Sequence, residues 1–262
     1  MSIVLASLLA VSAPQESPSQ VVWKWRPGDT NCILRQDVGG GRLFDIGMSP
    51  GIEDVGFKIV DTRARTREAK PLKGIDVTFL PGGTAKLDGY LDSNKTPIGR
   101  NVWVFLGPDG PARLAGASGV TVSQSEVGSM EIAIQSPGAA IDAVRACADQ
   151  RLKEWGVDAV ALRALSVRPT PATPTEKWFS WSDYPDREKI YKNDIEVVAR
   201  LDVAADGSVL KCTVVNRPPK EFIPAACNAL MRNAKFNPAR DAQGQAVAAP
   251  FLFQVVFAAY YI

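Results

Sequence analysis

The stretch VVARLDVAADGSVLKCTV, residues 197–214, predicts a β-hairpin in the last third of the chain. Apolar and polar residues alternate in its first half, as they do on a strand with one buried face. Asp206-Gly207 then marks a tight turn, and the alternation resumes over residues 210–214. We therefore expect two antiparallel strands joined at this turn.

A helix and a long strand are expected after the hairpin. Between Phe222 and Ala234 apolar residues recur every three or four positions, which is the spacing of a helix with one buried face. Val247 to Tyr261 is rich in Phe, Val and Tyr and alternates again, so it predicts the last strand. The order of elements is then ββαβ.

Several short motifs surround these elements. The motif residues are Tyr184 and Pro185 before the hairpin, Asp206 and Gly207 in its turn, Phe236, Pro238 and Ala239 before the last strand, and Gly244 at its entry. With these motifs in this order, residues 181–262 resemble the TonB C-terminal domain family, the energy transducer TonB-like proteins.

The resemblance implies a periplasmic domain that holds the short TonB-box segment of outer-membrane receptors by β-augmentation. In this mode an extended peptide adds as a strand to an exposed sheet edge. Pro250 fits an edge strand, because a proline has no N–H for a ladder hydrogen bond. The expected peptide-binding edge runs through Val247, Ala249, Phe251, Phe253 and Val255. Two alternatives stay open: the strand only completes the core, or it pairs with its copy in a homodimer.

The sequence departs from full-length TonB in ways that bear on function. TonB carries an inner-membrane helix with a coupling histidine and a long Pro-rich arm, whereas this chain has no histidine. Its apolar N-terminal run is shorter than the ~20 residues of a membrane span. We expect no stable transmembrane anchor and no energy transduction by this chain.

The preceding part of the chain, residues 17–165, predicts a β-rich domain of a family that the motifs do not identify. Short β-type runs alternate with Gly- and Pro-containing turns, which is typical of a β-sandwich or barrel. One helix is expected at its end, with Ser136 as its cap, Pro137 in the first turn and Gly156 just beyond it. The predicted fold is mainly β with α+β character.

Two other segments have their own signals. Residues 1–13 carry a nearly continuous apolar run, broken only by Ser7, that ends in small residues, which predicts a signal peptide and export to the periplasm. Residues 166–180 contain alternate prolines between 168 and 175, which predicts a semi-rigid Pro-rich linker. The TonB-like domain would then occupy residues 181–262.

Four cysteines permit three pairings. Cys32 with Cys147 and Cys212 with Cys227 is favoured, because each pair closes a loop within one of the two predicted domains. Disulfides agree with export to an oxidising compartment. Four free thiols are the alternative.

Few kinds of chemistry are open to this chain. The absence of histidine excludes Ser-His-Asp and Cys-His catalysis and the usual mixed zinc sites. A net charge of +2 does not favour nucleic acid as a partner. We expect no catalytic residue, metal or cofactor, and a non-enzymatic cell-envelope protein that binds a peptide of an outer-membrane receptor or another envelope transport protein. A self-associating structural protein, or an enzyme in the N-terminal β-domain, is the alternative.

Overall fold

The structure is a computed structural model that describes residues 23–26, 30–51, 55–65, 69–93, 99–185 and 195–257. The predicted signal peptide and residues 258–261 of the predicted last strand lie outside this part of the chain. The described part is mostly β with a few helices, which confirms the predicted fold class.

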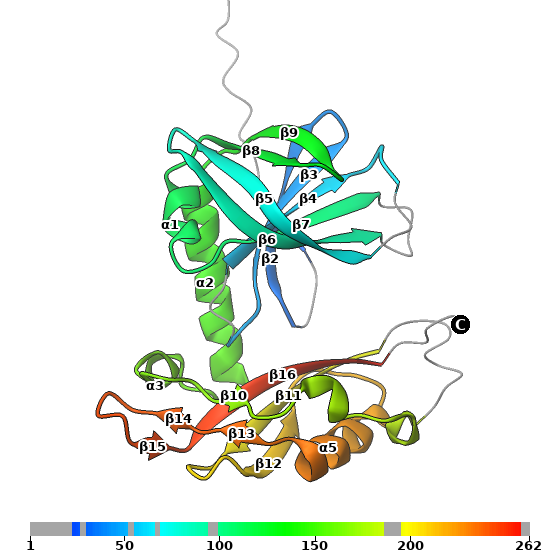
Figure 1. The fold of residues 1–262 in the computed structure, drawn as a ribbon, viewed down its shortest axis with the longest axis vertical. Coiled ribbons are helices and arrows are strands. Elements are labelled where there is room, and N and C mark those ends of the chain that lie inside the picture. Colours follow the sequence, from blue (N-terminus) through cyan, green and yellow to red (C-terminus); the bar gives the residue numbers. More distant parts are fainter. Residues whose placement is uncertain are drawn as a thin grey trace, which may run out of the picture.

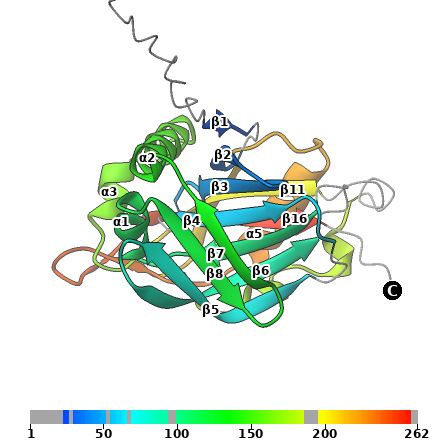
Figure 2. The ribbon, with the colours of Figure 1, turned by 90° about the horizontal axis from the view of Figure 1, so that it is seen from above.

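The first nine strands form one curled sheet (Figures 1 and 2). Their order is β1-β2-β3-β4-β7-β6-β5-β8-β9, and all neighbours are antiparallel. The sheet is therefore continuous, with β1 and β9 at its ends, and is closer to the predicted barrel than to a sandwich of two sheets. Its strands are β1 (Lys24–Trp25), β2 (Cys32–Gly39), β3 (Arg42–Met48), β4 (Val55–Asp61), β5 (Lys70–Leu80), β6 (Thr84–Ser93), β7 (Arg100–Phe105), β8 (Gly119–Gln124) and β9 (Gly128–Ala133).

The inner face of this sheet and two helices enclose one apolar core. Helices α1 (Gly110–Ala115) and α2 (Pro137–Glu154) lie together at one side of the curled sheet (Figure 2). The apolar stripe of α2 packs into the core, and the Cys32–Cys147 disulfide ties the helix to β2. Ser136 is at the N-cap with a positive φ of 49°, and its side chain makes no capping hydrogen bond, so only its position was predicted correctly.

The last third of the chain builds a three-stranded sheet in the order β12-β11-β16. Its strands are β11 (Ile195–Val203), β12 (Val209–Val214) and β16 (Ala249–Phe257). Helix α5 (Phe222–Asn233) covers one face, and the Cys212–Cys227 disulfide joins it to β12. The predicted ββαβ order is therefore present. Val247 is not in the long strand, because it pairs with Ala239 between the short strands β15 (Ala246–Val247) and β14 (Ala239–Arg240).

The family motif residues hold the turns and the core of this region. Gly207, at φ +83°, lies against β13 (Phe236–Asn237), where the Phe236 N–H donates to the Gly207 carbonyl at 3.1 Å. Hydrogen bonds from the Ser208 hydroxyl and N–H to Asp206 lower the pKa of this carboxyl group. The Tyr184 ring meets Phe257 with 5.1 Å between centroids. Of the others, Ala239 is buried, Pro238 is half-buried, Pro185 is exposed, and Gly244 has a φ of +77° in the turn before β15.

The segment predicted as a linker, residues 166–180, packs against the C-terminal region instead of spanning free space. We call residues 166–185 the strap; it contains β10 (Thr170–Pro171) and the 3-10 turns η1 (Thr175–Lys177) and η2 (Trp181–Asp183). β10 pairs with β13, and the buried Trp178 ring lies 5.0 Å from Phe253 and 5.4 Å from Phe236, between centroids. The strap is extended at β10 and turns at η1 and η2.

The nine-stranded and three-stranded sheets meet at the C-terminal end of α2 (Figure 1). An apolar cluster there joins Leu152, Trp155 and Val157 to Val198 and the partly buried Leu252. The Arg200 guanidinium donates to the carbonyl oxygens of Trp155 and Gly156 at 2.6 and 3.3 Å, and so satisfies the end of the helix. A short helix, α3 (Ala159–Arg163), follows and adds Leu162 to the cluster.

Candidate functional site

β16 has one unpaired edge. Among the strands that the structure describes, it is hydrogen-bonded to β11 alone and lies at the end of the three-stranded sheet. Figure 1 shows it on the side of that sheet that faces the nine-stranded sheet. An unpaired edge presents a row of N–H and C=O groups that another extended chain can bind.

The hydrogen bonds of β11 show which backbone groups lie on this edge. The Val215 N–H donates to the Val198 carbonyl, and the Asn216 amide bonds the Glu196 carbonyl and the Val198 N–H, so even-numbered residues of β11 point toward β12. Its odd-numbered residues therefore point toward β16, where Leu201 faces Phe251 and Ala199 faces Phe253.

It follows that the even-numbered residues of β16 direct their backbone groups away from β11. The free donors are the N–H groups of Leu252, Gln254 and Val256, and no described residue outside the strand accepts a backbone hydrogen bond from them. Pro250 has the same orientation, so its missing N–H leaves no gap in the ladder with β11. The proline is thus compatible with this edge.

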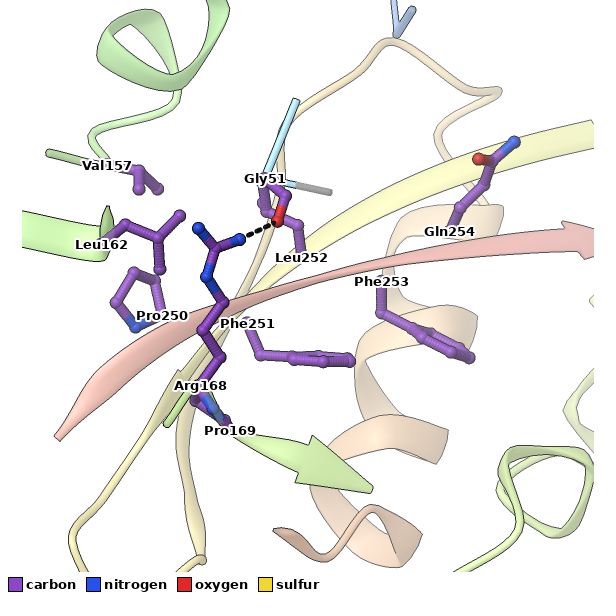
Figure 3. Close-up of a pocket in the computed structure, with 10 residues that line it drawn as sticks. All are labelled: Gly51, Val157, Leu162, Arg168, Pro169, Pro250, Phe251, Leu252, Phe253 and Gln254. Atoms are coloured by element: carbon purple, nitrogen blue, oxygen red, sulfur yellow. Dashed lines mark hydrogen bonds between the residues drawn. The ribbon is translucent and has the colours of Figure 1, made fainter. Parts of the chain in front are cut away.

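The odd-numbered residues named from the sequence have another role. Ala249, Phe251, Phe253 and Val255 bond to β11 through their backbones. The side chains of the last three pack in the core with α5 and Trp178. Figure 3 shows Phe251 and Phe253 on one side of β16 and Leu252 on the other. The unpaired backbone groups therefore lie at the residues between those that the sequence pattern picked out.

A cavity of about 300 Å³ follows the edge of β16 (Figure 3). Five consecutive residues, Pro250 to Gln254, line it. A cavity over the face of a sheet would be lined by alternate residues, because successive side chains point to opposite faces. The consecutive lining places this cavity along the strand's edge.

The opposite wall of the cavity comes from outside the ββαβ region. Val157 and Leu162 add apolar surface, and Arg168 and Pro169 come from the strap. The Arg168 guanidinium donates to the Gly51 carbonyl at 3.0 Å (Figure 3). A Cβ built on Gly51 would lie 2.4 Å from Leu252 Cδ1, so the loop that follows β3 is in close contact with β16. Sequence reasoning missed these wall residues, because none belongs to a motif.

Asp183 holds the strap in place through its hydrogen bonds. Burial raises the pKa of Asp183, but hydrogen bonds from Ser180 and from Arg232 outweigh it, so the pKa stays below its ordinary value of 3.8. These bonds fix the end of the strap to α5. Among the described residues, no group of three or more His, Cys, Asp or Glu side chains could hold a metal ion.

The comparisons with known proteins agree with the geometry over one segment of the chain. Residues 182–258 match the family model described as Gram-negative bacterial TonB protein C-terminal. No curated protein and no solved structure matches the chain. No helix within the described part is long and apolar enough to cross a membrane.

The matched family has general properties that bear on the function of this chain. Its domains are associated with the cell envelope, interact with envelope or outer-membrane proteins, and are non-enzymatic. The match begins in the strap and ends just after β16, so it spans the unpaired edge and the helix beneath it. Residues 182–258 of this chain therefore form a domain of the TonB C-terminal family.

Proposed function

We propose that this protein is a periplasmic, non-enzymatic binding protein that captures extended peptide segments of the TonB-box type on the free edge of β16. The observation that carries the proposal is the row of unpaired backbone groups at Leu252, Gln254 and Val256. A peptide strand added there would receive main-chain hydrogen bonds, while its alternate side chains would meet the walls of the cavity.

The domain organisation that we propose has an N-terminal β-rich domain packed on this binding domain. The cluster around Leu152 and Val198 and the hydrogen bonds of Arg200 support a fixed arrangement of the two. The strap supports it further, because it packs on the binding domain and reaches Gly51 through Arg168. The N-terminal domain would then act as one wall of the site.

The proposed partners are envelope proteins, above all outer-membrane transport proteins, and the proposed role is recognition without energy transduction. The chain has no histidine of the kind that couples TonB to its energising complex. Both disulfides fit an oxidising compartment such as the periplasm.

The test is a titration of the full chain with a fluorescein-labelled peptide that carries the TonB box of an outer-membrane receptor. Gln254→Pro should weaken binding about tenfold or more, because it deletes one free N–H and its ring blocks close approach. Gln254→Ala keeps the N–H group and is the matched control, with affinity within about threefold of wild type. Equal affinities of the proline and alanine variants would contradict strand addition at this edge.

Pairing of two copies through β16 is the competing use of the same edge, because a free edge is complementary to itself. Light scattering separates the two functions. The proposal expects a monomer that the peptide leaves monomeric. A dimer that Gln254→Pro dissociates, and that the peptide does not, would favour self-association.

A further inference from the structure

A hollow of about 470 Å³ lies beside the free edge, between β16 and the nine-stranded sheet. The hollow lies on the face of the nine-stranded sheet that is turned away from the apolar core of that sheet. Two glycines contribute to its lining, Gly47 of β3 and Gly56 of β4, which are directly opposite each other in the ladder. Since neither has a side chain, this part of the face is recessed. Gln254, which carries a free N–H group, lines the hollow from β16.

Aromatic side chains form one wall of this hollow. Trp103 of β7 is paired with Tyr90 of β6, and Phe105 lies two residues further along the same face. The exposed fractions of Phe105 and Tyr90 are 52% and 36%, which is high for large apolar groups. We call Tyr90, Trp103 and Phe105 the aromatic wall.

Trp103 is held in place by Lys58, its partner on the neighbouring strand β4. The Lys58 ammonium lies 4.2 Å from its ring centroid, and the same ammonium is 3.3 Å from Asp45 Oδ2. Asp45 also accepts two hydrogen bonds from Arg35 at 2.6 and 2.8 Å. Burial lowers the pKa of Lys58, while the Asp45 carboxylate opposes this shift. The wall therefore includes a ring with a fixed orientation, which costs little entropy to bind against.

The charge of the hollow disfavours an acidic side chain, and its aromatic lining favours an apolar one. Asp92 is its single charged lining residue among the residues that the structure describes, and no Lys or Arg lines it there. An acidic side chain would lose hydration and meet a carboxylate of the same sign. A neutral apolar side chain would instead bury area against the aromatic wall.

We infer that the hollow is a side-chain pocket for the peptide that adds to β16, and that it selects a large apolar residue in that peptide. The inference rests on the proposed function, and it names the class of segment that is bound. The occupant is an extended peptide because the hollow adjoins unpaired strand backbone at Gln254. In such a peptide every second side chain points to the face of β16 that carries Leu252 and Gln254 (Figure 3). Gln254 on this face lines the hollow together with the aromatic wall.

The selectivity belongs to the N-terminal sheet and not to the TonB-type domain. The aromatic wall and both glycines precede residue 182, where the family match begins. The N-terminal region thus provides the residues that read the sequence of the segment, while β16 provides the backbone that binds any extended chain.

The test uses a labelled nine-residue peptide of alternating valine and threonine with a lysine at each end, in which one internal valine is Gly, Phe or Glu. Affinities are measured for the wild-type chain and for the double variant Tyr90→Ser/Phe105→Ser. Trp25→Ser is the matched control, because Trp25 is also 52% exposed and lies outside the hollow. Gln254→Pro reports on binding at the edge itself.

In the wild type and in Trp25→Ser, the Phe peptide should bind about tenfold more tightly than the Gly peptide, and the Glu peptide most weakly. In the double variant the Phe-to-Gly ratio should fall to about twofold, with the affinity of the Gly peptide unchanged. An unchanged ratio in the double variant overturns the side-chain pocket.

The outcomes separate the two proposals. If the Gly peptide binds, Gln254→Pro weakens it and phenylalanine gives no gain, strand addition stands and the pocket is wrong. If phenylalanine gives its gain but Gln254→Pro has no effect, the occupant does not pair with β16 and both are wrong. Failure of all three peptides to bind overturns the side-chain pocket, and the titration with the TonB-box peptide then decides whether strand addition stands.

Discussion

Gly207 is a residue at which the hairpin turn and β13 of the C-terminal domain are in close contact. Its φ is +83°, and a Cβ at this position would lie 2.0 Å from the Phe236 carbonyl oxygen. Gly244 has a similar φ of +77°, but a Cβ there would meet no atom within 4 Å. Substituting Gly244 therefore measures the energy of an unfavourable backbone conformation alone, whereas substituting Gly207 adds the energy of a steric clash.

We predict that Gly207→Ala destabilises the protein by about 3 kcal/mol or more, because the backbone of β13 must move. Gly244→Ala should cost about 1 kcal/mol, the value expected for the backbone conformation alone. Urea unfolding curves of the two variants measure the difference. Equal losses of stability would show that the contact between the turn and β13 gives way without cost.

The carboxyl group of Asp183 should make the strap sensitive to acid. Its pKa is below 3.8 in the folded chain, so its stabilisation is complete above about pH 4 and is lost as the pH falls through the folded pKa. At pH 7, Asp183→Asn should therefore be less stable than wild type by about 1 kcal/mol, and at pH 2.5 the difference should be smaller. Unfolding free energies at the two pH values give the result; a constant difference would contradict this role.

At the scale of elements, the strap is the part that the sequence described least well. The prolines predicted an extended backbone, whereas the pairing of β10 with β13 depends on residues more than sixty positions later. The hairpin, α5 and β16 were predictable, because their periodicity is local. The burial of Trp178 could not be predicted, since a tryptophan beside a Pro-rich stretch has the same local pattern whether it packs or not.

Trp178→Ala should lower the unfolding free energy by about 3–5 kcal/mol, since it leaves a cavity beside Phe236 and Phe253. Trp181→Ala, at an exposed position of the same strap, should cost less than about 1 kcal/mol. Differential scanning calorimetry compares the two. Similar midpoints would mean that the strap contributes little to the stability of the domain.

The candidate site shows the same division between local and long-range information. Proline at position 250 indicated an edge strand, and the alternation separated the two faces of that strand. The free backbone groups of β16 can be identified only when the strand paired with each edge of β11 is known. That requires the register of β11 with β12 and with β16. The cavity walls at Gly51, Val157 and Arg168 come from three separate segments, and no motif links them.

On the scale of the whole molecule, one disulfide lies within each half, and non-covalent contacts hold the two halves together. Cys32 and Cys147 are separated by 115 positions, and Cys212 and Cys227 by 15. The pairing within each predicted domain is the one found in the structure. The contact between the sheets is apolar packing and the hydrogen bonds of Arg200 and Arg168.

Loop entropy predicts unequal effects of removing the two disulfides. Replacing Cys32 and Cys147 by serine should cost about 5 kcal/mol, against about 3 kcal/mol for Cys212 and Cys227. Guanidinium unfolding of the two double variants tests the order. A larger loss for the second pair would show that the helix α5 depends on its disulfide for more than a restricted unfolded chain.

The central claim is that a peptide adds as a strand to the free edge of β16, and amide hydrogen exchange tests it most directly. Exchange is followed by NMR at Leu252 and Gln254, in the full chain with and without a saturating TonB-box peptide. The account predicts that both amides exchange at least about tenfold more slowly in the complex, while Phe251 and Phe253, already bonded to β11, change little. A peptide that binds but leaves exchange at Leu252 and Gln254 unchanged would contradict it.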